Sequence, residues 1–74
     1  MTDHPSARVQ FARRFVATIP GQPDIHGVQF PDSGRVLTDD PHTGLTAFFD
    51  IDSVTEGIEG AAIHWADETS EEQP

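Results

Sequence analysis

The residues of this 74-residue chain that could bind a metal ion lie in the loop Thr38–Gly44, where two carboxylates and an imidazole follow one another closely. Asp39, Asp40 and His42 offer oxygen and nitrogen ligands that divalent cations take in proteins. The alternative is an Asx-type turn, in which an aspartate side chain accepts hydrogen bonds from backbone N–H groups around Pro41. Because the loop has no second histidine and no calcium-loop spacing, we favour the turn and predict no metal or other cofactor.

Further carboxylates follow the apolar segment that ends at Phe49, and these are Asp50, Asp52, Glu56 and Glu59. Two carboxylates can work as general acid and base when burial raises the pKa of one of them. Nothing in this stretch predicts such burial, so we interpret the four side chains as a solvated surface. His64 is likewise expected on a sheet surface. The chain also lacks cysteine, a phosphate loop and a nucleophile elbow, and we predict that it is not an enzyme.

The charge of the chain is strongly negative and unevenly distributed. The formal net charge is −9, and all four basic residues lie in the first half of the sequence, namely Arg8, Arg13, Arg14 and Arg35. From Val36 onward there are ten acidic residues and no Lys or Arg. This charge disfavours binding to nucleic-acid phosphates or to an anionic membrane. It is typical either of a solubilising surface or of a surface that meets a basic protein partner.

The elements that would position these side chains are mainly strands. Apolar residues alternate with polar ones, which is the period of a strand with one buried face. The predicted strands cover 13–19, 25–30, a return strand that ends at Thr38, 45–50 and 61–66. Arg13 and Arg14 are interpreted as charges that protect an edge strand from pairing with other molecules, in preference to an anion site.

A β-hairpin organises the centre of the chain. We expect a three-residue loop, Asp32–Gly34, whose glycine supplies the left-handed backbone position. In that register Phe30 lies opposite Val36, and Val28 lies opposite Thr38. The core is then predicted to contain one apolar face of each strand, made of Val28, Phe30, Val36, Leu45, Phe49, Ile63 and Trp65.

A short helix is predicted between the last two strands. Ser53 and Glu56 match a capping box, and Gly57 and Gly60 limit the helix to one or two turns. The sequence therefore predicts a small α+β domain over residues 8–66, built on a strongly bent, half-barrel-like antiparallel sheet of four or five strands. Residues 1–7 are expected to be a disordered lead-in, and residues 67–74 a disordered acidic tail.

The order of four motifs resembles a group of small proteins of unknown function from actinobacteria and their phages. These motifs are Arg-Arg-Phe-Val, then Gly-Val-Gln-Phe-Pro-Asp-Ser-Gly-Arg-Val-Leu, then Phe-Asp-Ile-Asp-Ser-Val, then Ile-His-Trp. The group shares the pattern R-F, G-V-x-F-x-D-G-x-V-x-L, S-[IV] and I-x-W, from which this chain departs by the insertion of Ser33. The resemblance spans about Arg13 to Trp65. It implies an accessory protein of a phage or mobile element and assigns no functional residue.

These observations lead to the hypothesis of a non-enzymatic, cytoplasmic protein-interaction module that acts on a basic, nucleic-acid-binding partner protein. The alternative is a structural subunit that forms a homodimer or completes a larger assembly. No apolar run of about 18 residues and no signal peptide pattern is found in the sequence. Strand alternation is expected to leave two apolar side chains off the core face beside the acids. The predicted partner-binding residues are Leu37, Phe48, Asp50, Asp52, Glu56 and Glu59.

Overall fold

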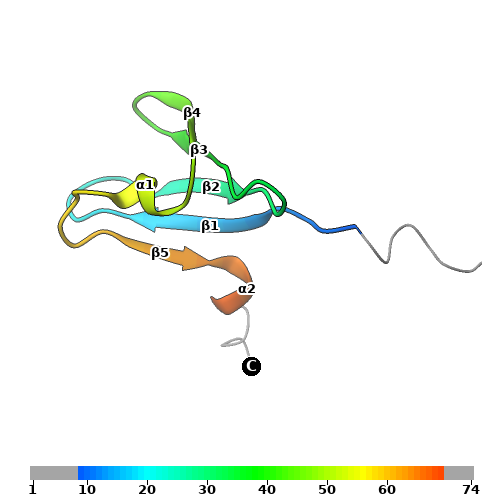
Figure 1. The fold of residues 1–74 in the computed structure, drawn as a ribbon. Helices are drawn as coiled ribbons and strands as arrows, with labels where there is room; N and C mark the ends of the chain where they lie inside the picture. The colour runs from blue at the N-terminus through cyan, green and yellow to red at the C-terminus, as the bar shows by residue number, and fades with distance from the viewer. Residues whose placement is uncertain (1–8, 70–74) are drawn as a thin grey trace, which may run out of the picture.

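The computed structural model describes residues 9–69 of the chain (Figure 1). Within this range the elements are β1 (Arg13–Thr18), β2 (Ile25–Gln29), β3 (Val36–Asp40), β4 (Gly44–Phe48), α1 (Asp52–Thr55), β5 (Ala62–Trp65) and α2 (Ala66–Thr69). The strands form one antiparallel sheet in the order β4-β3-β2-β1-β5. The predicted strands are therefore confirmed, to within two or three residues at their ends.

The sheet is strongly bent. The β3–β4 hairpin stands at a steep angle to β1, β2 and β5 (Figure 1). The helix α1 packs against the sheet through Val54, which is buried with Phe15 and Val36. The predicted class, a small α+β fold with a bent antiparallel sheet and a short helix just before the last strand, is confirmed. The sheet is open, with β4 and β5 as its two edges.

One face of the sheet, here called the core face, holds the buried residues. Phe15 lies opposite Gly27 of β2 on one side and opposite Trp65 of β5 on the other. The rings of Phe15 and Trp65 meet edge to face, with centroids 5.5 Å apart. Among the described residues the buried apolar side chains are Phe15, Ala17, Val36 and Val54, and the partly buried ones packed on them are Ile25, Phe48, Ile51, Ile63 and Trp65.

The central hairpin folds one residue out of the predicted register. Gln29, not Phe30, lies opposite Val36. Phe30 instead pairs with Arg35, whose carbonyl accepts a hydrogen bond from the Phe30 N–H at 2.8 Å, so the loop has four residues. Gly34 still occupies the left-handed region, with φ of 76°. Because side chains alternate between the faces, this shift moves Val28 and Phe30 off the core face, and Phe30 is 43% exposed.

The fourth strand also presents the face opposite to the one predicted. Phe48 lies opposite Val36 and packs on the core, whereas Leu45 and Phe49 are 72% and 80% exposed. The alternation itself was correct, since Leu45 and Ala47 do share one face. The pairing with β3 decides which face is buried, because Val36 is one of the most buried residues and brings Phe48 onto its own side. Ile63 and Trp65 face the core as predicted.

The interpretation of Arg13 and Arg14 as edge protection is wrong. β1 lies between β2 and β5, because the last strand returns to pair with the first. β2 pairs with Arg13–Ala17 and β5 pairs with Phe15–Thr18, so β1 is an interior strand and only its first two residues extend beyond β5. Arg13 and Arg14 lie on opposite faces of the sheet, because adjacent residues of a strand point to opposite faces.

The predicted capping box at Ser53 is also wrong. The helix α1 begins at Asp52, and its N-cap residue Ile51 makes no side-chain cap. Ser53 lies inside the helix, where its N–H and hydroxyl both donate to Oδ1 of Asp50, at 3.0 and 2.8 Å. In a capping box the Glu56 side chain would accept from the Ser53 N–H, but here the side chain of Asp50, three residues before Ser53, accepts from it instead.

The ends of the predicted domain differ in what the structure describes. Residues 66–69, which include the start of the predicted acidic tail, form the helical turn α2 instead of a disordered segment. The rest of that tail, residues 70–74, and the predicted lead-in, residues 1–7, lie outside the described residues.

Candidate interaction surfaces

The loop that carries the metal candidates is an Asx-type turn. Oδ1 of Asp40 accepts hydrogen bonds from the backbone N–H groups of His42 and Thr43, at 2.7 and 3.3 Å. Asp39 lies on the other face of β3, because it pairs with His26 and Leu45 one position away from Asp40. Within residues 9–69, no three histidine or acidic side chains lie close enough together to hold a metal ion.

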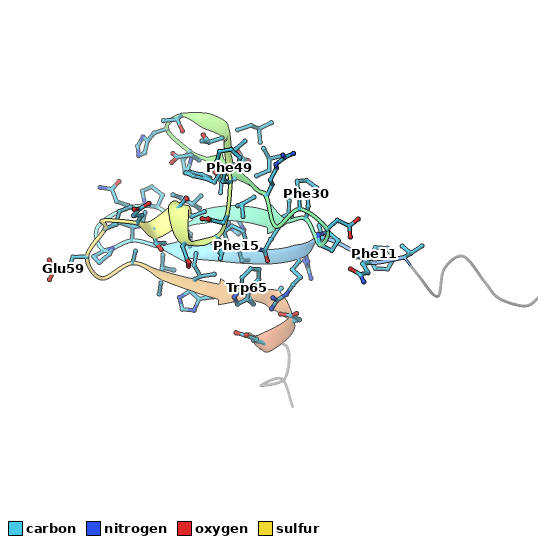
Figure 2. All side chains as sticks on the ribbon, viewed as in Figure 1. Phe11, Phe15, Phe30, Phe49, Glu59 and Trp65 are labelled. Carbon is cyan, nitrogen blue, oxygen red and sulfur yellow. The ribbon has the colours of Figure 1, made fainter. Side chains whose placement is uncertain are left out.

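The structure separates the predicted partner-binding residues into four places. Leu37 lies opposite Val28, on the face away from the core, whereas Phe48 packs on the core. Asp50, Asp52 and Glu56 follow β4 and border or belong to α1, and all three are exposed. Glu59 lies at the far end of the molecule, away from Phe30 and Phe11 (Figure 2). Its neighbour Gly60 sits against Pro20.

An exposed aromatic ring nevertheless stands beside the acids of α1. Phe49 is the first residue after β4 and is 80% exposed. Asp50 follows it directly, and Asp52 begins α1. We call the residues Phe49, Asp50, Asp52 and Glu56 the acidic loop. An apolar side chain beside these carboxylates is predicted, with Phe48 in that role. In the structure the next residue, Phe49, takes this place.

The face of the sheet opposite the core forms a second candidate surface, here called the outer face. Its central residues come from four strands and line a shallow depression of about 570 Å³, and they are Arg14, Val16, Val28, Leu37, Asp39 and Leu45. Leu37 is predicted off the core face and lies on the outer face, whereas Val28 and Leu45, which are predicted in the core, lie on the outer face as well. The period-two alternation of apolar residues indicates this surface in the sequence. The predicted hairpin register, which is wrong by one residue, assigns part of the surface to the core instead.

His64 lies on the outer face, where a sheet-surface position was expected for it. It pairs with Val16 on β1 and is exposed. Its Nε2 lies 3.1 Å from Oγ1 of Thr18 on the neighbouring strand, within hydrogen-bond distance. One ring nitrogen of His64 therefore has a hydrogen-bond partner within the sheet.

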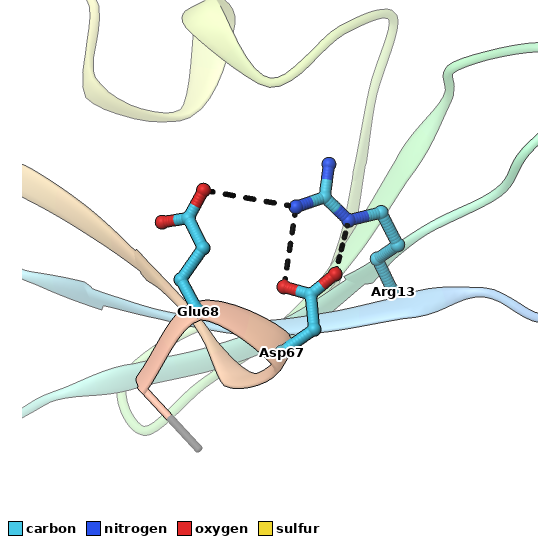
Figure 3. A network of polar contacts seen from close by, with 3 residues as sticks. All are labelled: Arg13, Asp67 and Glu68. Atoms are coloured by element: carbon cyan, nitrogen blue, oxygen red, sulfur yellow. Dashed lines mark hydrogen bonds and ion pairs between the residues drawn. The ribbon is translucent and has the colours of Figure 1, made fainter. Parts of the chain in front are cut away.

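Arg13 joins the sheet to the C-terminal turn. Its Nε and Nη2 donate to the two carboxylate oxygens of Asp67, at 3.1 and 3.2 Å, and Glu68 lies 4.0 Å from Nη2 (Figure 3). The guanidinium carbon also lies 3.9 Å from the centroid of the Trp65 ring. A bidentate pair between a guanidinium and a carboxylate fixes the relative orientation of the two groups as well as their distance. Arg13 therefore holds α2 against β1 and covers one face of the only tryptophan in the sequence.

The contact with Arg13 should make the position of α2 sensitive to acid. Hydrogen bonding from Arg13 holds the pKa of Asp67 below its usual value of 3.8. A carboxyl with a lowered pKa in the folded state stabilises the contact above its unfolded pKa, and this contribution is lost as the pH falls through the folded pKa. Trp65 fluorescence should therefore change below about pH 4 in the parent protein. Asp67→Asn should show the altered emission already at pH 7, and an identical acid titration of both proteins would contradict the contact.

Comparisons with known proteins leave the chain without an assigned family. No family model, no curated protein and no solved structure matches it. The motif resemblance to actinobacterial and phage proteins therefore stays a prediction. Within the described part of the chain, no helix is long and apolar enough to cross a membrane.

Proposed function

We propose that this protein is a non-enzymatic interaction module whose acidic loop binds a basic surface of another protein. The observation that carries the proposal is the 80% exposure of Phe49 directly beside Asp50 and Asp52. A large aromatic side chain on the surface supplies buried area when a partner covers it. An accessory role in a phage or mobile element fits the motif resemblance.

The surrounding carboxylates would guide a basic partner to this ring. The described salt bridges of the chain involve Asp67 and Glu68, and no ion pair is found for the acids of the acidic loop within residues 9–69. Their charge is therefore available to an approaching cation. Charges at the rim of an interface mainly raise the association rate and its dependence on salt, while the apolar contact sets the dissociation rate.

Replacement of Phe49 by Ala should weaken partner binding and leave the fold unchanged, because the side chain contributes little to the core. Affinity capture from native lysate should recover the partner with the parent protein and lose it with Phe49→Ala. Equal melting temperatures of the two baits would show that folding is unaffected. A partner recovered equally by both baits would contradict the proposed site.

Reversal of Glu56 to Lys should then slow association with the captured partner and flatten its salt dependence. Glu56→Gln is the matched comparison, because it removes the charge at the same position without reversing it. Charge guides the encounter of the two proteins, so this variant should have the smaller effect. Stopped-flow measurements at low and high salt give the association rates of both variants and the parent. Equal rates for all of them would contradict the guiding role of the charge and leave it a role in solubility alone.

A second candidate function is that of a structural subunit that associates with itself. The outer face favours this candidate because a sheet normally buries its apolar faces in a second layer. No described element covers the depression between Val28 and Leu45.

A further inference from the structure

We infer that a second copy of this chain covers the outer face and that the two copies pack sheet against sheet. This inference rests on the second candidate function, self-association, and does not depend on the partner of the acidic loop. It deepens that function by naming the surface, the occupant and the charge pair that joins the two copies.

The outer face is mainly apolar at its centre. Four of its six central residues are apolar: Val16, Val28, Leu37 and Leu45. Leu45 is 72% exposed, and the other three are only partly buried, by their neighbours in the sheet. On the core face, by contrast, α1 supplies Val54 as a second layer. The outer face lacks a comparable layer within residues 9–69.

The charge of the outer face differs from that of the whole chain. Two copies with a net charge of −9 each repel one another where their acidic surfaces meet. The charged residues that line the depression, however, are Arg14 and Asp39, one of each sign. The acidic loop, Glu59 and the two acids of α2 do not line this depression, and of α2 only Ala66 does. The outer face is therefore a surface on which two such chains can approach without a net repulsion between the groups in contact.

The positions of these two charges suit a two-fold contact. Arg14 lies on β1 and Asp39 on β3, on either side of β2, where Arg14 pairs with Val28 and Asp39 pairs with His26. In an isologous dimer, a residue i that meets residue j of the other copy implies that j meets i as well. One two-fold axis across β2 thus brings Arg14 of each copy onto Asp39 of the other and forms the pair twice.

The area is also sufficient for a small dimer. Measured along the bent sheet, strands about 4.8 Å apart and about 3.4 Å per residue give the four strands of the outer face, over five residues each, an area of roughly 330 Å². Side chains that interdigitate bury more than this backbone area, so two copies whose bent faces fit together bury roughly 800–1,000 Å² in total. This lies at the lower end of specific interfaces, and predicts a dimer that dissociates on dilution.

Sedimentation velocity of the full chain across a range of concentrations tests the inference. The parent protein should shift from monomer toward dimer between about 1 and several hundred μM, as a small interface requires. Leu45→Glu should weaken the dimer at least tenfold, because it places a carboxylate in the apolar contact. Ile58→Glu is the matched control: Ile58 is 38% exposed, lies after α1 and does not line the depression, so this variant should dimerise like the parent.

The charge pair gives a test that does not depend on removing apolar surface. Arg14→Glu and Asp39→Arg should each weaken the dimer, because each juxtaposes like charges in both halves of the contact. The double variant Arg14→Glu/Asp39→Arg should recover most of the lost affinity, since the pair is restored with its signs exchanged. Melting temperatures of all variants, measured at a concentration where the parent is monomeric, show whether each chain is folded.

The possible outcomes separate this inference from the proposed role of the acidic loop. A parent protein that stays monomeric at all concentrations overturns the inference, and so does a dimer that Leu45→Glu leaves intact. Phe49→Ala and Glu56→Lys should leave the dimer unchanged, whatever their effect on a basic partner. A monomeric chain whose outer face is protected instead by an acidic protein would likewise exclude the second copy as the occupant.

Discussion

Replacement of Phe15 by Ala should leave this protein largely unfolded at room temperature. Phe15 is 2% exposed and lies at the centre of the core face, between Gly27 and Trp65. Truncation of a buried Phe to Ala costs about 3–5 kcal/mol, while small domains have only about 5–15 kcal/mol of stability in total. A 74-residue chain without disulfides lies at the low end of that range.

Phe30→Ala is the matched control for this expectation. It removes the same side chain from a position that is 43% exposed and off the core face, so it should lower the free energy of unfolding far less. Urea unfolding followed by Trp65 fluorescence measures both variants against the parent. If Phe30→Ala proved as damaging as Phe15→Ala, the register of the central hairpin would be wrong. The sequence-based prediction would then be restored, because it placed Phe30 opposite Val36.

Gly27→Ala should have the second largest effect on stability, about 1–3 kcal/mol. A Cβ at this position would lie 2.6 Å from Cζ of Phe15 and 2.9 Å from the backbone oxygen of Leu37. Neither atom can move freely, since the first belongs to the central ring of the core and the second to a paired strand. The absence of a side chain at Gly27 is therefore what allows the Phe15 ring to lie across β2.

A double-mutant cycle can test the origin of this effect. In a Phe15→Leu background the end of the ring is absent, so Gly27→Ala should cost less than it does in the parent, with the contact to the Leu37 oxygen as the remainder. Gly21→Ala is the comparison that isolates backbone strain from steric contact. Its φ of 77° is unfavourable for alanine, but no atom lies within 4 Å of the added Cβ. Additive costs of Gly27→Ala and Phe15→Leu would show that the two residues do not meet.

Several features of this protein are determined by local sequence. The alternation in Arg13–Thr18 and in Ala62–Trp65 is sufficient to predict both strands, because each contains apolar residues at every second position. The turn residues around Gly34 predict the central hairpin, since a glycine accepts the left-handed backbone that such a loop requires. The Asx turn at Asp40 is equally local, as its hydrogen bonds reach only two and three residues along the chain. The acidic character of the surface follows directly from composition.

The tertiary structure decided which face of each strand is buried and which strands are edges. A period of two defines two faces but does not say which one packs, and one additional residue in the loop after Phe30 exchanges them. Phe48 is thus drawn to the core by Val36, while Leu45 and Phe49 remain exposed. The place of β1 inside the sheet depends on its pairing with β5, about 50 residues away, and no local pattern encodes a contact of that range. The outer face exists for the same reason, because only the pairing of β1, β2 and β3 brings Arg14, Leu37 and Asp39 onto one surface.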